Sequence, residues 1–482
     1  MSESLSFKIR SEVPASYMER LLNFIYVHYL LPQTQRFSSF FKEITPEGAV
    51  LSYLILDTRG NAVIQAKIRG TTPLDVTFTL INDAVPLKLI EDAKQDIVIA
   101  VHLFEEQVRR NTLYFAWREG ERLVPEEMRL QRSFNRLLLE TQILLFTTFI
   151  ILGMFLFAVI GTIFPDAFWV MPIVLLSVQF FIMFYSSKLI TRTADWGITE
   201  ANPTVHFLEY RLPFESHGDL KHMLSAEKLA AIKKEVYDEI LMKQGEIDCE
   251  STRRIFEKYG ILCQPENLSA KKVNVYALVK KVATEFDFPM PNIVVSNTMV
   301  PNAAAAGPSP SRGVVLLTTG LLIQLEENEI LSVLGHEFGH LKGRDPLILF
   351  GLTSAEFVFR FYVLFPLFPI LFSSFFFFIY FWFVMTIIFF IAKFFEARAD
   401  LVSAVKTKQP EALASALEKI GFQRLLYERA PSFRRQEWLR LDAHPPVSFR
   451  LSRLRQITPA KEIKYPLIQS IRDVIAGFVE SF

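Results

Sequence analysis

The chain has 482 residues, a formal net charge of +1 and 51% hydrophobic residues, among them 46 phenylalanines. This length predicts two or three domains, and the balanced charge gives no reason to expect a nucleic-acid-binding protein. The two cysteines, Cys249 and Cys263, lack metal-ligand spacing and are too few for a disulfide framework, so we interpret them as incidental thiols of a reducing compartment.

Residues 1–138 are predicted to form a soluble N-terminal α+β domain. Apolar residues at helical spacing predict helices over Tyr17–Leu31 and Lys88–Val108. Alternating apolar residues between turn signals predict strands over Ala49–Leu56, Ala62–Ile68, Val76–Ile81 and Thr112–Trp117. No catalytic constellation occurs in this part, which is compatible with a regulatory or with a substrate-binding domain.

Two apolar runs without a charged residue follow, Ile143–Phe164 and Phe168–Tyr185. A membrane-spanning helix needs about 20 such residues, so we predict a first transmembrane hairpin over residues 139–187. Arginines and lysines flank both runs, whereas the link between the runs has none. The positive-inside rule therefore places both flanks in the cytoplasm.

Residues 188–285 are predicted to form a helical cytoplasmic region with an insertion, with helices over Ala226–Lys243 and Ala270–Phe286. Residues 286–345 are predicted to begin a metal-binding core. This core has strands over Asn292–Asn297 and Val314–Thr318, joined by a loop over Pro301–Gly313. An exposed strand beside a metal site can hold a peptide as an additional strand.

The core contains the motif HExxH, formed by His336, Glu337 and His340. Residues i and i+4 share one face of a helix, so the two imidazoles can bind one metal ion. Glu337 is placed to take a proton from a water molecule held there. Apolar residues at helical spacing precede the motif, and Gly343 is predicted to end the helix. The alternative is a chance match on an ordinary amphipathic helix.

A second transmembrane hairpin is predicted over residues 346–393, from the apolar runs Pro346–Leu371 and Phe375–Ala392. No lysine or arginine lies between the runs, so both ends are expected on the cytoplasmic side. Glu356 and Arg360 lie four residues apart near the middle of the first run. We expect them to pair, either as a structural ion pair or as part of a substrate path.

Residues 394–482 are predicted to complete the core and to end in a helical tail. Glu396 is the best candidate for a third metal ligand, because it lies just beyond the second hairpin. Asp400 shares its helix face and can accept a hydrogen bond from a ligand imidazole. The alternative for this stretch is a solvated helix start in which Arg398 pairs with the acids.

The stretch Asp442–Arg455 carries two further candidates. His444 can donate a hydrogen bond to an oxyanion, and Arg450 can bind a carboxylate or orient a substrate. The pattern fits equally well a helix-cap or surface histidine beside a solvated basic face.

Together, HEFGH and EARAD separated by two spans resemble the HtpX-like membrane zinc metallopeptidases, relatives of the CAAX prenyl endopeptidases. Further matches are VPNAAAAG at 300–307, VVLLTTGLL at 314–322 and AHPPVSFR at 443–450. The resemblance implies one Zn²⁺ held by His336, His340 and Glu396. It also implies Glu337 as general base, Asp400 behind the ligands, and three residues near the substrate: Asn302, His444 and Arg450.

We therefore expect a mainly α membrane protein with four transmembrane helices in two hairpins, a cytoplasmic zincin-type α+β protease domain and an N-terminal soluble α+β domain. The resemblance implies an endopeptidase for peptide or membrane-protein substrates, acting in quality control at a bacterial inner membrane. The alternatives are a processing protease for one lipid-anchored substrate and a non-catalytic membrane scaffold. The oligomeric state stays open.

Overall fold

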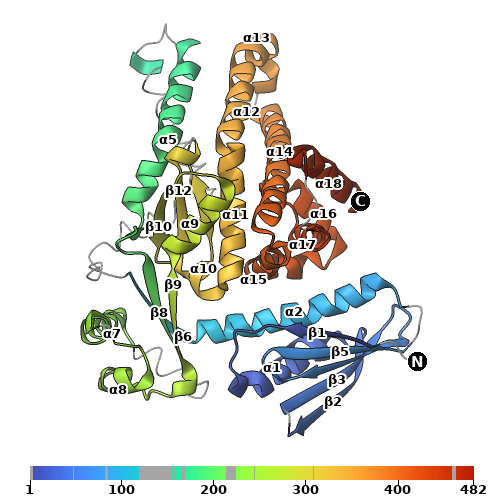
Figure 1. Ribbon diagram of the computed structural model, residues 1–482. Coiled ribbons are helices and arrows are strands. Elements are labelled where there is room, and N and C mark those ends of the chain that lie inside the picture. Colours follow the sequence, from blue (N-terminus) through green and yellow to red (C-terminus); the bar gives the residue numbers. More distant parts are fainter. Residues whose placement is uncertain are drawn as a thin grey trace. The chain divides into compact units, whose positions relative to one another are not determined.

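The computed structural model describes residues 4–46, 48–81, 85–118, 155, 159, 161–163, 169–212, 224–243, 245–307, 309–372, 374–458 and 463–482. The chain divides into two compact units (Figure 1). Unit 1 comprises Met1–Phe115 and Phe207–Lys271, and unit 2 comprises Ala116–His206 and Lys272–Phe482. Part of the predicted region 188–285 thus belongs with the N-terminal residues.

Unit 1 is built on an antiparallel sheet with the strand order β1-β5-β4-β3-β2. Its strands are β1 Ser4–Ile9, β2 Phe37–Thr45, β3 Gly48–Leu56, β4 Ala62–Arg69 and β5 Leu74–Leu80. The predicted strands β3 to β5 are confirmed. The sequence did not predict β1 and β2, because both are edge strands whose residues are mostly exposed and lack a clear apolar alternation.

The helices of unit 1 are α1 Met18–Phe24, which continues as a π-helix over Ile25–Leu30, α2 Leu87–Arg110, α7 Ala226–Glu239 and α8 Cys249–Lys258. The two predicted N-terminal helices are confirmed. Asp96 on α2 is buried, and it accepts hydrogen bonds from the Tyr29 hydroxyl at 2.5 Å and from Arg36 at 2.6 Å. Both partners lie outside α2, so this carboxylate ties the helix to the segment around Tyr29.

Cys249 and Cys263 form a disulfide, with their Cα atoms 5.7 Å apart. The interpretation of the two cysteines as unrelated residues is therefore wrong, because the fold brings their sulfurs together. Cys249 begins α8, and the chain reverses after that helix at Gly260, whose φ of +77° favours glycine. The reversal returns Cys263 to the start of α8, which the spacing in the sequence does not reveal.

A three-stranded sheet has the order β6-β8-β9, and its strands are β6 Thr112–Arg118, β8 Thr204–Arg211 and β9 Leu268–Asn274. Together with β7 (Trp196–Ile198), β8 and β9 correct the expectation that residues 188–285 are helical. Several neighbouring residues of β8 are buried together. A strand that is buried on both faces loses the alternation by which strands are recognised.

The sheet of unit 2 has the order β11-β12-β10-β7, with β10 Asn292–Ser296, β11 Ala303–Ala306 and β12 Val314–Thr318. The predicted strands β10 and β12 are confirmed and pair in parallel. The predicted loop Pro301–Gly313 contains β11, which pairs antiparallel with β12 at the edge of the sheet. Alanine has a low strand propensity, so this strand carries no local signal.

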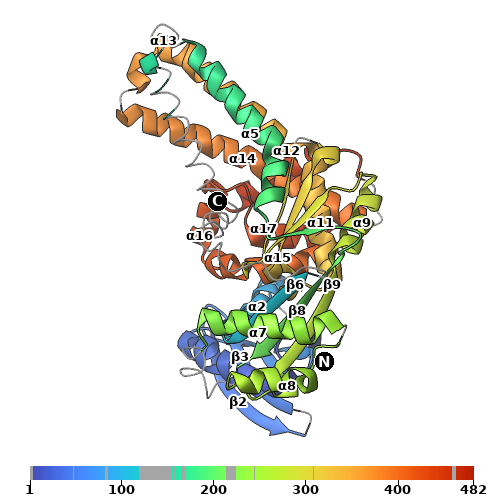
Figure 2. The same cartoon turned by 90° about the vertical axis from the view of Figure 1, so that its left-hand side faces the viewer.

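Helices surround this sheet and extend from it in unit 2 (Figures 1 and 2). They are α5 Met171–Thr193, α9 Val275–Phe286, α10 Thr319–Gln324, α11 Glu327–Gly343, α12 Asp345–Phe359, α13 Phe365–Leu367, α14 Ser374–Thr407, α15 Pro410–Glu428, α16 Pro431–Leu439, α17 Val447–Arg455 and α18 Pro466–Glu480. Both views show α5, α12 and α14 reaching away from the compact part of the unit.

Among the residues that the structure describes, three stretches are long and apolar enough to cross a membrane: Met171–Lys188, Asp345–Leu367 and Phe375–Thr407. They coincide with three of the four predicted spans. The fourth, Ile143–Phe164, lies almost entirely outside the described residues. The expected pair of Glu356 and Arg360 is confirmed at 2.8 Å, and the Tyr380 hydroxyl donates to the same carboxylate. This pairing satisfies a charge that would be costly to leave alone in lipid.

Candidate metal centre

Helix α11 carries the HExxH motif. Its first turn is closed by a capping box between Glu326 and Glu329. The helix ends at Gly343 and is followed by Arg344, which adopts the left-handed conformation with φ of 54°. The helix thus ends at Gly343, as the sequence predicted, but the left-handed residue is Arg344 and not the glycine. Gly343 has a different role: a Cβ at this position would lie 1.8 Å from Nη2 of Arg398. The glycine leaves space for that guanidinium.

Gly343 is the last of three glycines at four-residue spacing, and all three face α14. A Cβ at Gly335 would lie 2.7 Å from Oγ of Ser403, and a Cβ at Gly339 would lie 3.1 Å from Cα of Ala399. Residues four apart share one helix face, so this glycine face lets α14 approach α11 closely. The sequence analysis did not identify this glycine face, although the four-residue spacing of the glycines around HExxH is visible in the sequence.

The close approach brings Glu396 of α14 onto the histidine pair of α11. Nε2 of His336 and Nε2 of His340 are 3.1 Å apart. The Glu396 oxygens lie 3.3 Å from Nε2 of His340 and 3.4 Å from Nε2 of His336. Tetrahedral zinc with ligand distances of about 2.0–2.1 Å separates neighbouring ligand atoms by roughly 3.3 Å. The three predicted ligands therefore fit one zinc ion.

The charges at this site also suit a cation. Oε2 of Glu396 is buried and has no hydrogen-bond partner among the described residues. Burial alone would lower the pKa of His336, but Asp400 and Glu396 outweigh it and raise that pKa. Burial likewise opposes protonation of His340, yet Glu396 and Asp345 raise its pKa to about 10. Buried carboxylates that attract protons onto imidazoles offer the same attraction to a metal cation.

Asp400 lies behind the first ligand, as the sequence predicted. Its Oδ1 is 2.9 Å from Nδ1 of His336, so it orients the imidazole with Nε2 toward Glu396. The guanidinium of Arg450 donates two hydrogen bonds to Asp400, at 2.8 and 2.7 Å. Arg450 is thus buried on a carboxylate of the protein, and its predicted contact with substrate stays a prediction.

A second arrangement of the same kind supports the other ligand. Oδ2 of Asp345 lies 2.8 Å from Nδ1 of His340 and 2.6 Å from Nη2 of Arg398. Each of the two histidines therefore contacts an aspartate through its Nδ1, and each of these aspartates in turn accepts a hydrogen bond from an arginine. The sequence analysis overlooked Asp345, because its position just beyond the left-handed residue Arg344 gives it no regular helical spacing from His340.

We expect Asp345→Asn to weaken zinc binding by about 10- to 100-fold, the usual cost of losing a carboxylate that orients a metal-binding histidine. Asn keeps the size of the side chain but removes its charge. Zinc affinity, measured by competition with a chromophoric chelator, checks this. Asp473→Asn is the matched control, since Asp473 pairs with Arg453 and belongs to neither histidine. Equal affinities of the two variants would contradict the role of Asp345.

Glu337 lies between the ligands and the edge strand β11. Its Oε2 accepts a hydrogen bond from the Ala305 amide at 2.8 Å. Burial raises the pKa of Glu337, although the two histidines act in the opposite direction. A carboxylate with a raised pKa is a stronger base, which suits the proton transfer predicted for it.

Of the remaining predicted residues, His444 lies beside Glu396, and Asn302 lies at the start of the edge strand β11. Nε2 of His444 is 3.6 Å from Oε2 of Glu396, and its Nδ1 is 2.7 Å from Oδ1 of Asp442. Asn302 immediately precedes β11, and its backbone exchanges hydrogen bonds with Thr318. The structure thus gathers every residue predicted for the site into unit 2. The roles of His444 and Asn302 toward a substrate stay predictions.

Comparison with known proteins agrees with this geometry. The family described as Peptidase family M48 matches residues 269–458, which include all three ligand candidates. A protease HtpX homolog of Desulforapulum autotrophicum is 32% identical over 211 residues, which are 38% of this chain and 68% of that protein. The chain belongs to peptidase family M48.

Other M48 relatives match a smaller share of their own length. Protease HtpX homolog 2 of Methanosarcina acetivorans is 32% identical over 180 residues, and the match covers 33% of this chain and 57% of the relative. A protease HtpX homolog of Moorella thermoacetica is 32% identical over 179 residues, covering 32% and 59%. The chain thus spans less than two thirds of the length of these two relatives. The activity named for them is therefore only proposed for this chain.

The crystal structure of S. mikatae Ste24p is also similar, with 15% identity and a TM-score of 0.37 over 76% of this chain and 74% of that one. This likeness is too low to carry an argument. The resemblance to HtpX-like proteins and their relatives is confirmed by the M48 match and the HtpX homologs.

Proposed function

We propose that this chain is a membrane-integrated, zinc-dependent endopeptidase. The observation that carries the proposal is the set of His336, His340 and Glu396, whose ligand atoms lie within 4.8 Å of one another. A general-base candidate, Glu337, stands directly beside this set. A membrane scaffold without catalysis would not need a carboxylate at this position.

A zinc ion held by these residues would acidify a water molecule and polarise a peptide carbonyl. Glu337 takes the proton from the attacking water and delivers it to the leaving amine. His444, when protonated, donates from Nε2 to the oxygen that becomes negative, while Asp442 holds the ring by its Nδ1. Asp400 and Asp345 keep the ligand imidazoles oriented throughout.

The edge strand β11 supports a way of holding the substrate. The four residues Ala303–Ala306 pair antiparallel with β12, and the amide of Ala305 donates to Glu337. In an antiparallel ladder, alternate residues of an edge strand turn their N–H and C=O groups outward. A peptide in extended conformation can add to this edge, which would lay one of its peptide bonds beside Glu337 and the ligands.

Removing the metal tests the proposal. We expect the purified full chain in lipid nanodiscs to lose cleavage of a peptide library after treatment with 1,10-phenanthroline and to regain it when about one equivalent of Zn²⁺ is added. Full cleavage by protein from which elemental analysis detects no bound metal would contradict the proposal. Serine- and cysteine-protease inhibitors serve as controls for a contaminating protease.

The cellular role that we propose is quality control of membrane proteins, and the alternative is the processing of one lipid-anchored substrate. Sequencing the products distinguishes these two roles. Cleavage at many positions in damaged membrane proteins supports quality control, whereas one defined cleavage position supports processing.

We further propose that both units face the cytoplasm of a bacterial inner membrane, from the charges that flank the spans. A reducing cytoplasm keeps cysteines as thiols, whereas Cys249 and Cys263 are positioned to bond. We therefore expect both cysteines to be alkylated in acid-quenched cells and to form the disulfide after purification in air. Mass spectrometry measures this state. An oxidised pair in the quenched cells would contradict the cytoplasmic location of unit 1.

A further inference from the structure

Helix α18 lies beyond residues 269–458, which the family match covers, and it packs against the membrane-spanning helix α14. The ring of Phe478 on α18 lies 5.2 Å from that of Phe390 on α14 and 6.0 Å from that of Trp438 on α16. Gly477 permits this contact, because a Cβ there would meet the Phe449 ring at 2.6 Å. The buried residues Ser470 and Val474 lie on the same side of α18.

This packing uses only part of the apolar surface of α18. Ile468, Ile475 and Val479 are 52%, 46% and 65% exposed. Their spacing of seven and four residues places them on one face of the helix. The exposed residues Gln469 and Glu480, eleven residues apart, lie on a different face, and exposed Arg472 borders the apolar row, so α18 presents an apolar face and a polar face to its surroundings.

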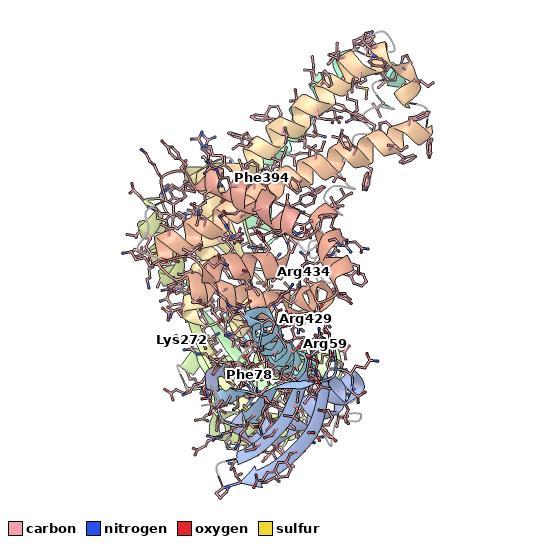
Figure 3. The ribbon with its side chains drawn as sticks, turned by 90° about the vertical axis from the view of Figure 1, so that its right-hand side faces the viewer. Arg59, Phe78, Lys272, Phe394, Arg429 and Arg434 are labelled. Atoms are coloured by element: carbon pink, nitrogen blue, oxygen red, sulfur yellow. A yellow bond between two sulfur atoms is a disulfide. The ribbon has the colours of Figure 1, made fainter. Side chains whose placement is uncertain are left out.

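The exposed apolar face continues a surface of α14. Ile379, Phe383 and Ile387 are exposed at four-residue spacing along α14, within the stretch that can cross a membrane. Phe390 follows in the same row, and there α18 covers the helix. Both ribbon views place α18 beside the part of α14 that leaves the compact unit, and Figure 3 labels Phe394 in this part of α14.

We propose that α18 lies in the membrane interface with Ile468, Ile475 and Val479 in contact with lipid. An exposed apolar face that continues the surface of a spanning helix meets the same solvent as that helix, which is the bilayer. Tyr465, which precedes α18, is exposed, as is Arg435 on α16. Tyrosine and arginine are typical of the level of the lipid headgroups.

The position of α18 in the interface determines the distance between the candidate metal centre and the bilayer. Phe390 contacts α18, and Glu396 follows it by six residues on the same helix, which is about 9 Å at a rise of 1.5 Å per residue. The centre therefore lies on the order of 10 Å from the interface. If the proposed peptidase function holds, its substrate class is the extended segment that directly adjoins a membrane anchor.

Lipid contact is measured without reference to activity. Ile475→Cys and, as the matched control on the polar face, Gln469→Cys are introduced into full-length protein that carries Cys249→Ser and Cys263→Ser. Each is labelled with the fluorophore NBD and placed in phosphatidylcholine nanodiscs. We expect doxyl-labelled lipid to quench the label at 475 and iodide to quench the label at 469.

Two outcomes overturn the lipid contact. Iodide quenching at both positions would show that α18 lies in water. A label at 475 that neither quencher reaches would show a protein neighbour, such as a second copy of the chain.

The substrate class is tested with two substrates that share one cleavage sequence, a soluble peptide and a peptide that adjoins a transmembrane anchor. We expect the double variant Ile475→Glu, Val479→Glu to slow cleavage of the anchored substrate by about tenfold. Without the apolar face of α18 in the interface, the candidate metal centre is no longer held at a fixed distance from the bilayer. Cleavage of the soluble peptide should stay unchanged, which also shows that the variant is folded. Gln469→Glu is the control.

An equal change for both substrates, including no change, would overturn the substrate class. If the wild-type protein cleaves neither substrate, the proposed function fails instead, and the quenching result still decides the position of α18.

Discussion

Glu337→Gln is expected to abolish most peptide hydrolysis and to leave zinc binding nearly intact. Glutamine fills the same space and can still contact the Ala305 amide through its oxygen, but it cannot accept the proton from water. General-base catalysis contributes roughly 10²- to 10⁴-fold, so we expect a fall in kcat of that order. Zinc stoichiometry and single-turnover cleavage, measured on the same preparations in nanodiscs, test both halves of this expectation.

Glu327→Gln is the matched control for this variant. Glu327 lies on the same helix, in its exposed first turn, and contributes neither a ligand nor a base. Its variant should cleave like the wild type. If Glu337→Gln cleaves as fast as the wild type, another group takes the proton. If it loses zinc as well, Glu337 is a ligand rather than the base.

Gly339→Val is expected to have the second-largest effect, because it separates the two helices that carry the candidate metal ligands. The new Cβ would lie 3.1 Å from Cα of Ala399. Both atoms are fixed to the backbones of their helices and cannot rotate apart, so α14 must shift. Overpacking of this kind costs on the order of 1–3 kcal/mol of stability. We expect a lower melting temperature and a loss of zinc affinity of at least about tenfold, since a displaced Glu396 no longer completes the site.

Gly351→Val controls for the loss of a helical glycine. Gly351 lies on α12, and a Cβ there would have no heavy atom within 4 Å. Valine at this position should leave both zinc affinity and melting temperature close to the wild type. Intrinsic helix propensity acts alike at the two positions, so the difference between the variants reports helix contact. Unchanged zinc affinity in Gly339→Val would contradict the role of the glycine face.

The candidate metal ligands could be predicted because they carry local patterns. His336 and His340 are four residues apart, and so are Glu396 and Asp400, so helical geometry alone brings each pair onto one face. The spans could be predicted because an apolar run of sufficient length has few other stable environments. Disulfide formation by Cys249 and Cys263 could not be predicted, since it depends on a chain reversal at Gly260 rather than on their spacing.

The sequence by itself indicated the candidate ligands, the candidate base and the apolar spans of this protein, because each of these patterns lies within one helix. Only the tertiary structure decided how these parts meet. β11 is a strand because β12 offers it hydrogen bonds, although its four alanines have little tendency to form one. Asp345 contacts His340 and is itself held by a hydrogen bond from Arg398 on α14, more than fifty residues away in sequence. Such contacts depend on packing between distant segments, and local periodicity carries no information about them.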